Sequence, residues 1–394
     1  MFNKAMENVS LSPIVAISEE VNKKALETGK DFILFQRGEI GFSTPKYIVD
    51  AMVDALNQGL TKYPVSGGHL KLKKAIIQKL SHFNSINGLE PENIVVTHGG
   101  QEGLQLAFKL FEGKKAVGFA PVWSCVLENM VPYSRTDLIQ IPLADDFSVD
   151  YNLLEDEIKD AAFLYLNTPH NPTGKILSKE EIENVVTICS KYGTYIISDE
   201  AYERITFEGK KHFSPMQLNY ENIIGIYTFS KTYAMTGWRL GYLVSRNKKI
   251  TDLIKLGDYT QTAGVPTFTQ FAGAEAILNT EMEKESVDSF MNEFSVRRNT
   301  LYDGLKAIDG VKLPIKPEGA FYIFPDFSEF VPKNIDKDES RLFVFNKLMD
   351  AGVATVYGSC FGKYFQNNLR FSYSTTNLKQ IEEGISRIKI ALHK

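Results

Sequence analysis

The chain has 394 residues, with 44 Lys and Arg against 48 Asp and Glu, which gives a formal net charge of −4. This length exceeds the roughly 250–300 residues at which a single hydrophobic core stops growing, so two domains are expected. The nearly balanced charge excludes a strong electrostatic case for nucleic acid or an anionic membrane as the main partner. Any bound anion is therefore expected at a local site.

The cysteines and the N-terminal sequence indicate in which cellular compartment the protein is expected. Cys125, Cys189 and Cys360 are too far apart for a disulfide framework or a zinc spacing, and they are interpreted as buried small hydrophobic residues in a reducing compartment. The opening sequence MFNKAMENVSLSP lacks the apolar run of a signal peptide, and no stretch approaches the ~20 apolar residues of a membrane span. These features favour a cytoplasmic protein.

Residues 48–290 alternate between short apolar runs and amphipathic stretches such as 101–111 and 178–191. The apolar runs lie at 93–98, 115–120, 138–143, 162–167, 194–199, 223–229 and 240–245. Several are continuous, which is typical of strands buried on both faces. The alternation predicts a three-layer α/β/α domain with a mostly parallel sheet.

The pattern changes after residue 290 and predicts a smaller α+β domain. Helices are expected at 288–308, at 340–351 and from about 377, with strands at 352–358 and 368–374. Residues 1–47 are too short and irregular to fold alone. The expected organisation is an N-terminal segment (1–47) joining the small domain, a large domain (48–290) and the small domain itself (291–394), with a cleft between the two domains.

The segment 228–242 (TFSKTYAMTGWRLGY) combines an amine, a hydroxyl and a guanidinium, from Lys231, Ser230 and Arg239. Most lysines are simply surface charges. Here, however, an amine beside two phosphate-binding groups suits an aldehyde cofactor that carries a phosphate. A lysine forms a Schiff base with such an aldehyde once its pKa is depressed.

Asp199 is the last residue of the run 194–199, at the strand end where ligands bind in open α/β sheets. An acid there can also cap the next helix. A pyridine nitrogen, however, needs a buried carboxylate to stay protonated, and protonation makes the ring an electron sink. Tyr202 is expected on the same face of a helix that starts here, within reach of the ring hydroxyl.

The tetrapeptide Asn-Pro-Thr-Gly at 171–174 has the composition of a turn. Because it follows the apolar run 162–167, it opens at the same sheet edge as Asp199. Asn171 can donate a hydrogen bond to the phenolate oxygen of the cofactor or to a substrate carboxylate.

In this order and spacing, the three segments resemble the class I/II aminotransferases, the fold-type I family of pyridoxal 5′-phosphate enzymes typified by aspartate aminotransferase. The likeness runs from about residue 30 to the C-terminus. It implies that Lys231 carries the cofactor and moves the α-proton, while Asp199 keeps the ring protonated. The expected reaction, in amino-acid metabolism, transfers an amino group between an L-amino acid and a 2-oxo acid by a ping-pong mechanism.

The resemblance also implies roles for residues near the cofactor. Gly99, Gly100 and Gln101 match the family's phosphate cup, where free N–H groups and the helix dipole favour an anion. Trp123 matches the aromatic residue that stacks on the pyridine ring, although a Trp after a strand is more often part of a core. Tyr63 resembles the tyrosine that reaches the phosphate of the neighbouring subunit, which implies a homodimer with shared active sites.

Two further residues are expected to bind the substrate. Arg370 resembles the arginine that clamps the α-carboxylate through a bidentate pair, the alternative being an exposed charge on an edge strand. Gly38 resembles the glycine whose backbone approaches the substrate. The six histidines show no ligand spacing, although His98 departs from the Asn or Ser often found beside the phosphate cup, and no metal site is expected.

Several alternatives stay open on sequence alone. The same scaffold hosts carbon–sulfur β-lyases, synthases, decarboxylases and oxidases, which the cofactor motifs do not separate. A nucleotide-binding protein is disfavoured because no G-x-G-x-x-G opens a helix after the first strand. A non-catalytic regulator is disfavoured because no DNA-binding domain fits before residue 30. Gln101 stands where some members carry a lysine for a distal carboxylate, and no arginine occurs in 259–268, which favours neutral or aromatic substrates.

Overall fold

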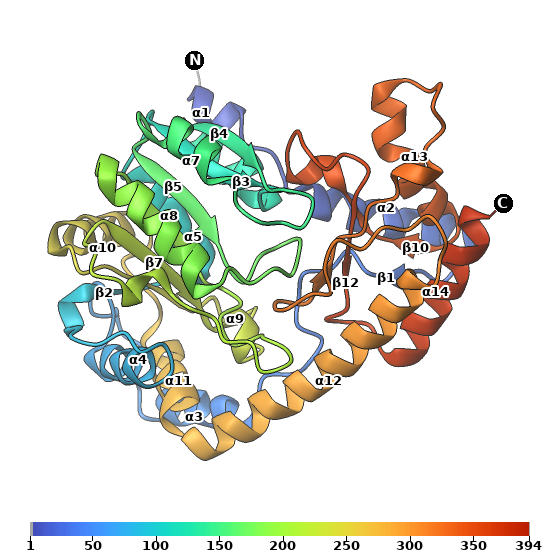
Figure 1. The fold of residues 1–394 in the computed structure, drawn as a ribbon. Helices are drawn as coiled ribbons and strands as arrows, with labels where there is room; N and C mark the ends of the chain where they lie inside the picture. Colours follow the sequence, from blue (N-terminus) through green and yellow to red (C-terminus); the bar gives the residue numbers. More distant parts are fainter. Residues whose placement is uncertain (1–2, 394) are drawn as a thin grey trace.

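The computed structural model describes residues 3–393, and its centre is a seven-stranded sheet (Figure 1). The strand order is β2-β8-β7-β6-β5-β3-β4, and β8 runs antiparallel to both of its neighbours. The prediction of a mostly parallel sheet is confirmed. The strands are β2 (Ile94–Thr97), β3 (Lys115–Ala120), β4 (Asp137–Pro142), β5 (Phe163–Asn167), β6 (Tyr195–Asp199), β7 (Ile223–Thr228) and β8 (Gly241–Val244).

Both faces of this sheet are buried, as the continuous apolar runs predict. Along β5, Phe163 and Tyr165 belong to one hydrophobic core while Leu164 and Leu166 belong to the other. Successive strand residues point to opposite faces, so each face requires its own layer of helices. Around the sheet lie α3 (Lys46–Asn57), α4 (Leu70–His82), α5 (Gly99–Lys109), α6 (Val131–Ser134), α7 (Tyr151–Ile158), α8 (Lys179–Tyr192), α9 (Phe229–Thr232), α10 (Lys248–Thr262) and α11 (Thr267–Leu278).

A smaller unit forms around a three-stranded antiparallel sheet of order β11-β12-β9. The strands are β9 (Tyr322–Ile323), β10 (Val353–Ala354), β11 (Val356–Tyr357) and β12 (Leu369–Ser372), and the helices are α12 (Thr280–Lys306), α13 (Lys337–Asp350) and α14 (Leu378–Leu392). Helix α12 runs along the lower edge of the molecule from α3 and α11, which are among the helices around the large sheet, to α14 of this unit (Figure 1). It begins at Thr280, not at the predicted residue 288, because the Asn279 side chain caps it by accepting a hydrogen bond from the Met282 amide.

The N-terminal segment contacts both parts of the molecule. Strand β1 (Ile33–Leu34) pairs in parallel with β10, as expected for a segment that joins the small unit, and α2 (Pro13–Thr28) precedes it. In contrast, α1 (Lys4–Glu7) is followed by Ser10, whose amide donates to the Glu128 carbonyl beside the large sheet. The predicted domain limits stay predictions.

Two local predictions were wrong. No helix starts after Asp199, because residues 201–204 form turns and the Asp199 carboxylate accepts a hydrogen bond from the Ala201 amide. Cys125 is only half-buried, unlike Cys189 and Cys360, because it faces the cavity described below.

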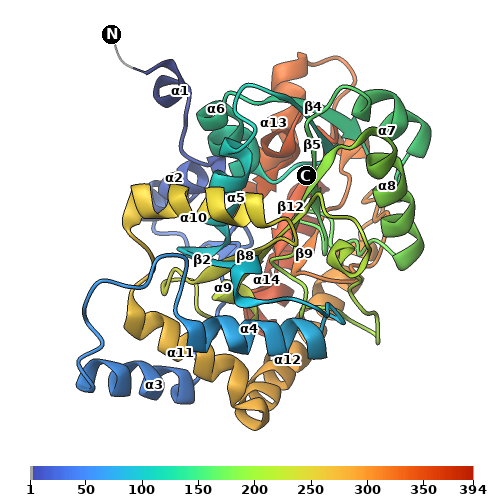
Figure 2. The ribbon, with the colours of Figure 1, turned by 90° about the vertical axis from the view of Figure 1, so that its left-hand side faces the viewer.

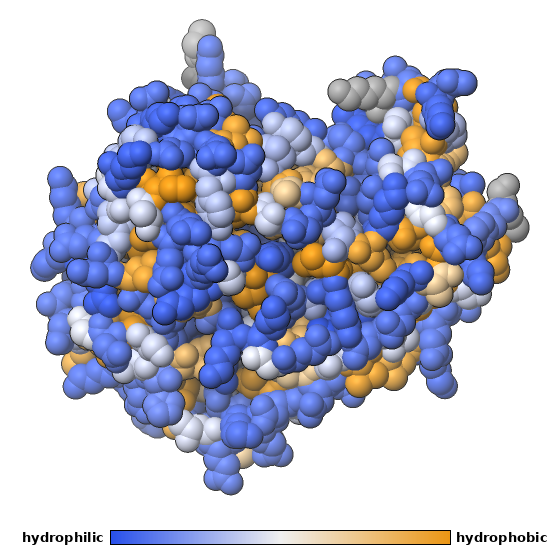
Figure 3. Space-filling model, in the orientation of Figure 1, coloured by the Kyte–Doolittle hydropathy of each residue, from blue (hydrophilic) through white to orange (hydrophobic). Residues whose placement is uncertain are grey.

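The surface in Figure 3 is mostly hydrophilic, with hydrophobic residues showing between the charged side chains. On another side of the molecule, α3, α10 and α11 lie near the loop that leads into α4 (Figure 2). In the described part of the chain, no helix is both long and apolar enough to cross a membrane.

Candidate active site

Lys231 lines a cavity of about 440 Å³ at the carboxyl ends of the parallel strands. The residue lies on α9, directly after β7, and its Nζ atom donates a 2.6 Å hydrogen bond to the Gly38 carbonyl. Burial lowers the pKa of this amine to about 8. The negative charge of Glu39 raises this pKa, and the positive charges of Arg370 and Arg239 lower it further. A substantial fraction of the amine is therefore neutral, and nucleophilic, near physiological pH.

Asp199 ends strand β6 as a buried carboxylate. It accepts hydrogen bonds from the Tyr165 hydroxyl at 3.0 Å and the Ala201 amide at 3.2 Å. Burial nevertheless raises its pKa to about 6, since these neutral donors and distant Lys231 only partly offset desolvation. Among the described residues no cation pairs directly with it. A protonated ring nitrogen would supply the missing positive charge.

Arg370 lies on β12 and is fully buried, so the alternative of an exposed charge on an edge strand is wrong. Its guanidinium donates to the Asn171 side chain at 3.1 Å and to the Gln36 carbonyl at 2.8 Å. Its Nε atom is buried without a partner. Gly38 lies close by, because a Cβ there would come within 2.8 Å of the Tyr322 hydroxyl and 3.9 Å of Arg370 Nη2.

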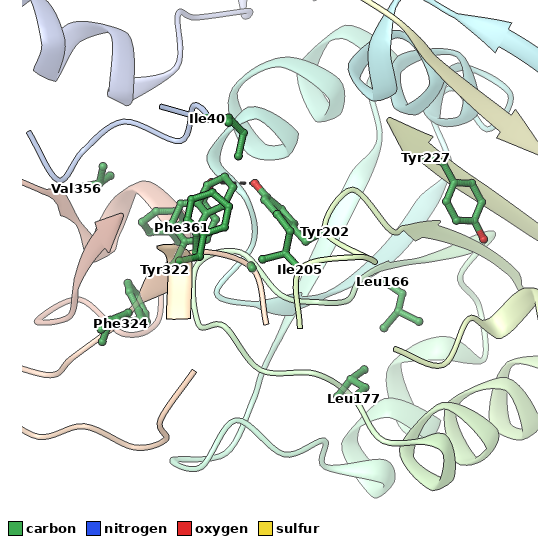
Figure 4. Packing of buried hydrophobic residues seen from close by; sticks show 14 of the residues in the cluster. Ile40, Leu166, Leu177, Tyr202, Ile205, Tyr227, Tyr322, Phe324, Val356 and Phe361 are labelled. Atoms are coloured by element: carbon green, nitrogen blue, oxygen red, sulfur yellow. Dashed lines mark hydrogen bonds between the residues drawn. The ribbon is translucent and has the colours of Figure 1, made fainter. Parts of the chain in front are cut away.

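Two tyrosines link the two units beside Asn171. The Tyr202 and Tyr322 hydroxyls share a 2.8 Å hydrogen bond, which Figure 4 marks with a dashed line. Asn171 donates to the Tyr202 hydroxyl at 3.5 Å. Tyr322 also places its ring 4.5 Å from the Arg370 guanidinium. These contacts fix the orientation of the groups that point into the cavity.

The N-terminus of α5 forms a cradle next to Arg239. Gly99 has a positive φ of 75°, and a Cβ at this position would come within 2.6 Å of Arg239 Nη2. The same guanidinium atom donates to the His98 carbonyl at 3.4 Å. Close by, the Thr228 hydroxyl donates to Ser230 at 2.9 Å. Amides at a helix start, a guanidinium and hydroxyls are the donors that bind phosphate.

The cavity gathers nearly all of the site residues predicted from the sequence. Those that line it are Gly38, Gly100, Gln101, Trp123, Asn171, Asp199, Tyr202, Ser230, Lys231, Arg239 and Arg370. Gly99 lies next to Arg239, beside the lining residues. Tyr63 is separate, because its side chain is 93% exposed on the loop before α4.

Sequence reasoning overlooked several lining or supporting residues. Tyr165 donates to Asp199 from the neighbouring strand, and the pairing of Asn167 with Asp199 in the β5–β6 register could have suggested it. Arg37 and Glu39 line the cavity on either side of Gly38. The start of α2 also contributes Ile14 to the lining, and no motif in the N-terminal segment indicated this.

The expectation of no metal site also needs a qualification. His98, Glu102 and Asp258 bring three possible ligand atoms within 4.8 Å of one another, although the histidines show no ligand spacing in the sequence. His98 Nδ1 contacts Glu102 at 3.1 Å, and the Asp258 carboxylate accepts a hydrogen bond from Thr262. These side chains form a polar cluster beside the phosphate cradle.

A lysine with a lowered pKa, a buried acid and a buried arginine around one cavity define an enzyme that works on the α-carbon of amino acids. The family model described as "Aminotransferase class I and II" matches residues 30–388. The chain therefore belongs to the class I and II aminotransferases, whose members use pyridoxal phosphate, and it is a transaminase of the fold-type I architecture.

Individual relatives agree with this assignment. A protein described as a probable aspartate aminotransferase from Methanocaldococcus jannaschii is 36% identical over 360 residues, covering 89% of this chain and 91% of the relative. Aspartate aminotransferase from Thermus thermophilus with maleate superimposes with a TM-score of 0.91 at 28% identity, covering 99% of each chain. An aromatic aminotransferase from Pyrococcus horikoshii superimposes with a TM-score of 0.84 at 29% identity, covering 95% of this chain and 98% of that one.

Proposed function

We propose that this transaminase binds pyridoxal 5′-phosphate through the Lys231 amine and uses Arg370 to hold the α-carboxylate of its substrate. The observation that carries the proposal is one cavity lined by a lysine with a pKa of about 8, a buried carboxylate without a counter-cation and a buried arginine with an unpartnered Nε atom. Each unsatisfied group matches one part of the cofactor or the substrate.

The lining residues fit the cofactor group by group. The first amides of α5, Ser230 and Arg239 would hold the phosphate, and the cradle at Gly99 leaves no room for a larger residue. Asp199 would pair with the ring nitrogen, Trp123 would stack on the ring, and Tyr202 with Asn171 would donate to the ring oxygen. When bound, the cofactor supplies an electron sink for the negative charge that develops at the substrate α-carbon.

The protein supplies binding and proton transfer. Arg370 forms a bidentate pair with the α-carboxylate and so orients the α-carbon toward the lysine. Lys231 would take the α-proton on its Nζ atom and deliver it to the cofactor carbon that receives the amino group, and a pKa of about 8 lets the amine act as both base and acid near neutral pH. The Gly38 carbonyl holds this amine in place through its 2.6 Å hydrogen bond.

The names of the relatives favour an amino acid with a second carboxylate as one substrate. This differs from the preference for neutral or aromatic side chains that Gln101 suggested.

The active unit is proposed to be a homodimer in which Tyr63 reaches the partner's phosphate. Its side chain is 93% exposed, and the helices α3 and α10, which lie on the same side of the molecule as the loop that carries it (Figure 2), also have exposed apolar residues, with Val53 at 49% and Leu256 at 63%. Such a patch is typical of a subunit interface. Light scattering should give twice the chain mass, and Tyr63→Phe should weaken cofactor binding without changing that mass.

The decisive experiment replaces Lys231 with Ala and compares it with Lys159→Ala, which removes a half-exposed lysine at the end of α7. Lys231→Ala should lose borohydride trapping of the cofactor and reduce turnover by several orders of magnitude, since nucleophile and base are lost together. The control should keep both. Amino transfer that requires an oxo-acid acceptor supports transamination, whereas ammonia and pyruvate release without an acceptor would identify the lyase alternative.

A further inference from the structure

Arg37 lines the active-site cavity, and its guanidinium has no partner among the described residues. The residue is exposed in the extended segment after β1, and it lines the cavity together with its neighbours Gly38 and Glu39. Within residues 3–393, no carboxylate lies within 4.0 Å of its guanidinium nitrogens, and its side chain donates no hydrogen bond. A guanidinium carries five donors, so this side chain has its full capacity available for a ligand.

The backbone places Arg37 between two groups of the proposed mechanism. The carbonyl of Gln36 accepts a hydrogen bond from Arg370 at 2.8 Å, and the carbonyl of Gly38 accepts one from Lys231 at 2.6 Å. Consecutive Cα atoms are about 3.8 Å apart, so the Arg37 side chain starts next to the space between the α-carboxylate site and the amine. A substrate side chain that extends into this space would come within reach of the Arg37 guanidinium.

The charges around the cavity leave Arg37 without an assigned counter-ion. The lining contains four cations, Arg37, Lys231, Arg239 and Arg370, but only two carboxylates, Glu39 and Asp199. The proposed function pairs Arg239 with phosphate, Arg370 with the α-carboxylate and Asp199 with the ring nitrogen.

Glu39 does not neutralise Arg37. Its carboxylate accepts a 3.2 Å hydrogen bond from the Thr236 hydroxyl, and no ion pair joins it to Arg37 although the two residues are separated only by Gly38. Gln101, on the opposite element of the lining, is neutral. Arg37 is therefore available to bind an anion located away from the α-carboxylate.

We propose that Arg37 binds the side-chain carboxylate of the substrate and thereby selects acidic amino acids and their oxo acids. This inference rests on the proposed function and adds the residue that recognises the side chain of the substrate. The planar guanidinium forms two parallel hydrogen bonds with a carboxylate, which a neutral side chain cannot do. Because Arg37 is exposed, it stays hydrated when a neutral substrate binds, so neutral substrates lose the extra contact without a large penalty.

The test compares Arg37→Gln with the wild-type holoenzyme on aspartate, glutamate, alanine and phenylalanine. Because Gln removes the charge and the paired hydrogen bonds, kcat/KM for the two acidic substrates should fall about 10- to 100-fold. The values for alanine and phenylalanine should stay within about threefold of wild type. Arg135→Gln, which changes an exposed arginine at the end of α6 that does not line the cavity, should alter none of these values.

Ligand binding gives a second readout that does not depend on turnover. Succinate carries two carboxylates and propionate one, so Arg37→Gln should weaken succinate inhibition at least tenfold and leave propionate inhibition unchanged. Arg37→Lys should recover part of the succinate affinity. Equal losses for acidic and neutral substrates, or unchanged selectivity, would overturn the role of Arg37. If wild-type enzyme transaminated none of the four substrates, the proposed function itself would fail, which is a separate outcome.

Discussion

The Asp199→Asn substitution tests whether the ionised Asp199 carboxylate lowers the free energy of unfolding of the cofactor-free protein. Asp199 is 5% exposed, and burial raises its pKa from 3.8 to about 6. A shift of about 2 pKa units corresponds to roughly 3 kcal/mol, so the ionised carboxylate destabilises the cofactor-free protein by an amount of that order. Asparagine removes the charge and keeps an oxygen that can accept the Tyr165 hydroxyl.

The sign of the pH dependence follows from the direction of this shift. The folded protein holds the Asp199 proton more tightly than the unfolded chain, so the contribution of this group to stability is full below about pH 4. It is lost as the pH rises through about 6. All other groups are shared between the two proteins and cancel in the comparison. Relative to Asp199→Asn, the free energy of unfolding of the wild type should therefore fall by about 2 kcal/mol between pH 4.5 and pH 7.5.

Urea unfolding of both cofactor-free proteins at the two pH values measures this difference directly. Added pyridoxal phosphate should reverse the order at pH 7.5, because only the wild type gains an ion pair with the ring. The variant should also lose about 10²- to 10³-fold in kcat, as expected when a preorganised charge is removed. A stability difference that is the same at pH 4.5 and 7.5 would show that the carboxylate is well solvated and would refute the reasoning.

Three further substitutions test other parts of the site and the core. Arg370→Lys should raise KM for every amino acid about 100-fold, because an ammonium cannot make the bidentate contact, and steady-state kinetics with alanine would reveal it. Gly99→Ala should weaken cofactor binding at least tenfold in a fluorescence titration, since its Cβ would displace Arg239. Phe163→Ala should reduce the free energy of unfolding by about 3–5 kcal/mol in urea, because this ring is fully buried in β5.

The reactive side chains at the carboxyl ends of the parallel strands could be predicted from the sequence, because the pattern of apolar runs shows where each strand ends. Asn171 follows β5, Asp199 ends β6 and Lys231 follows β7, and these three strands are neighbours in the sheet. Short apolar runs reveal such strands, and parallel strands bring their carboxyl ends to one edge. The positions of these side chains needed no information about distant contacts.

Contacts between distant segments could not be predicted in the same way. Whether Arg37 is paired depends on where the carboxylates of other elements lie, and its own sequence neighbourhood says nothing of them. The wrong helix after Asp199 has a similar cause. Glu200 there accepts hydrogen bonds from Ser198 and Ser214, and Glu203 pairs with Lys79 of α4, so long-range contacts hold the turn.

Most of the buried charged side chains have a partner of opposite charge within the described part of the chain, and the charged residues of the active-site cavity do not. Buried Glu203 is neutralised by Lys79 and also accepts from Asn84, and buried Arg298 pairs with Glu208 and donates to the Pro317 carbonyl. These ions are satisfied by the protein alone, as buried charges in a folded structure must be.

Asp199, Arg370 and Arg37 differ from those ions, and all three line one cavity. Asp199 lacks a counter-cation, Arg370 has a buried Nε atom without a partner, and Arg37 makes no side-chain contact with a described carboxylate. Asp199 and Arg370 are buried, so leaving them unpaired adds desolvation to the cofactor-free state, whereas Arg37 is exposed and adds a hydrated positive charge at the edge of the cavity. Their location together is explained if cofactor and substrate supply the missing charges: a ring cation, an α-carboxylate and a second carboxylate.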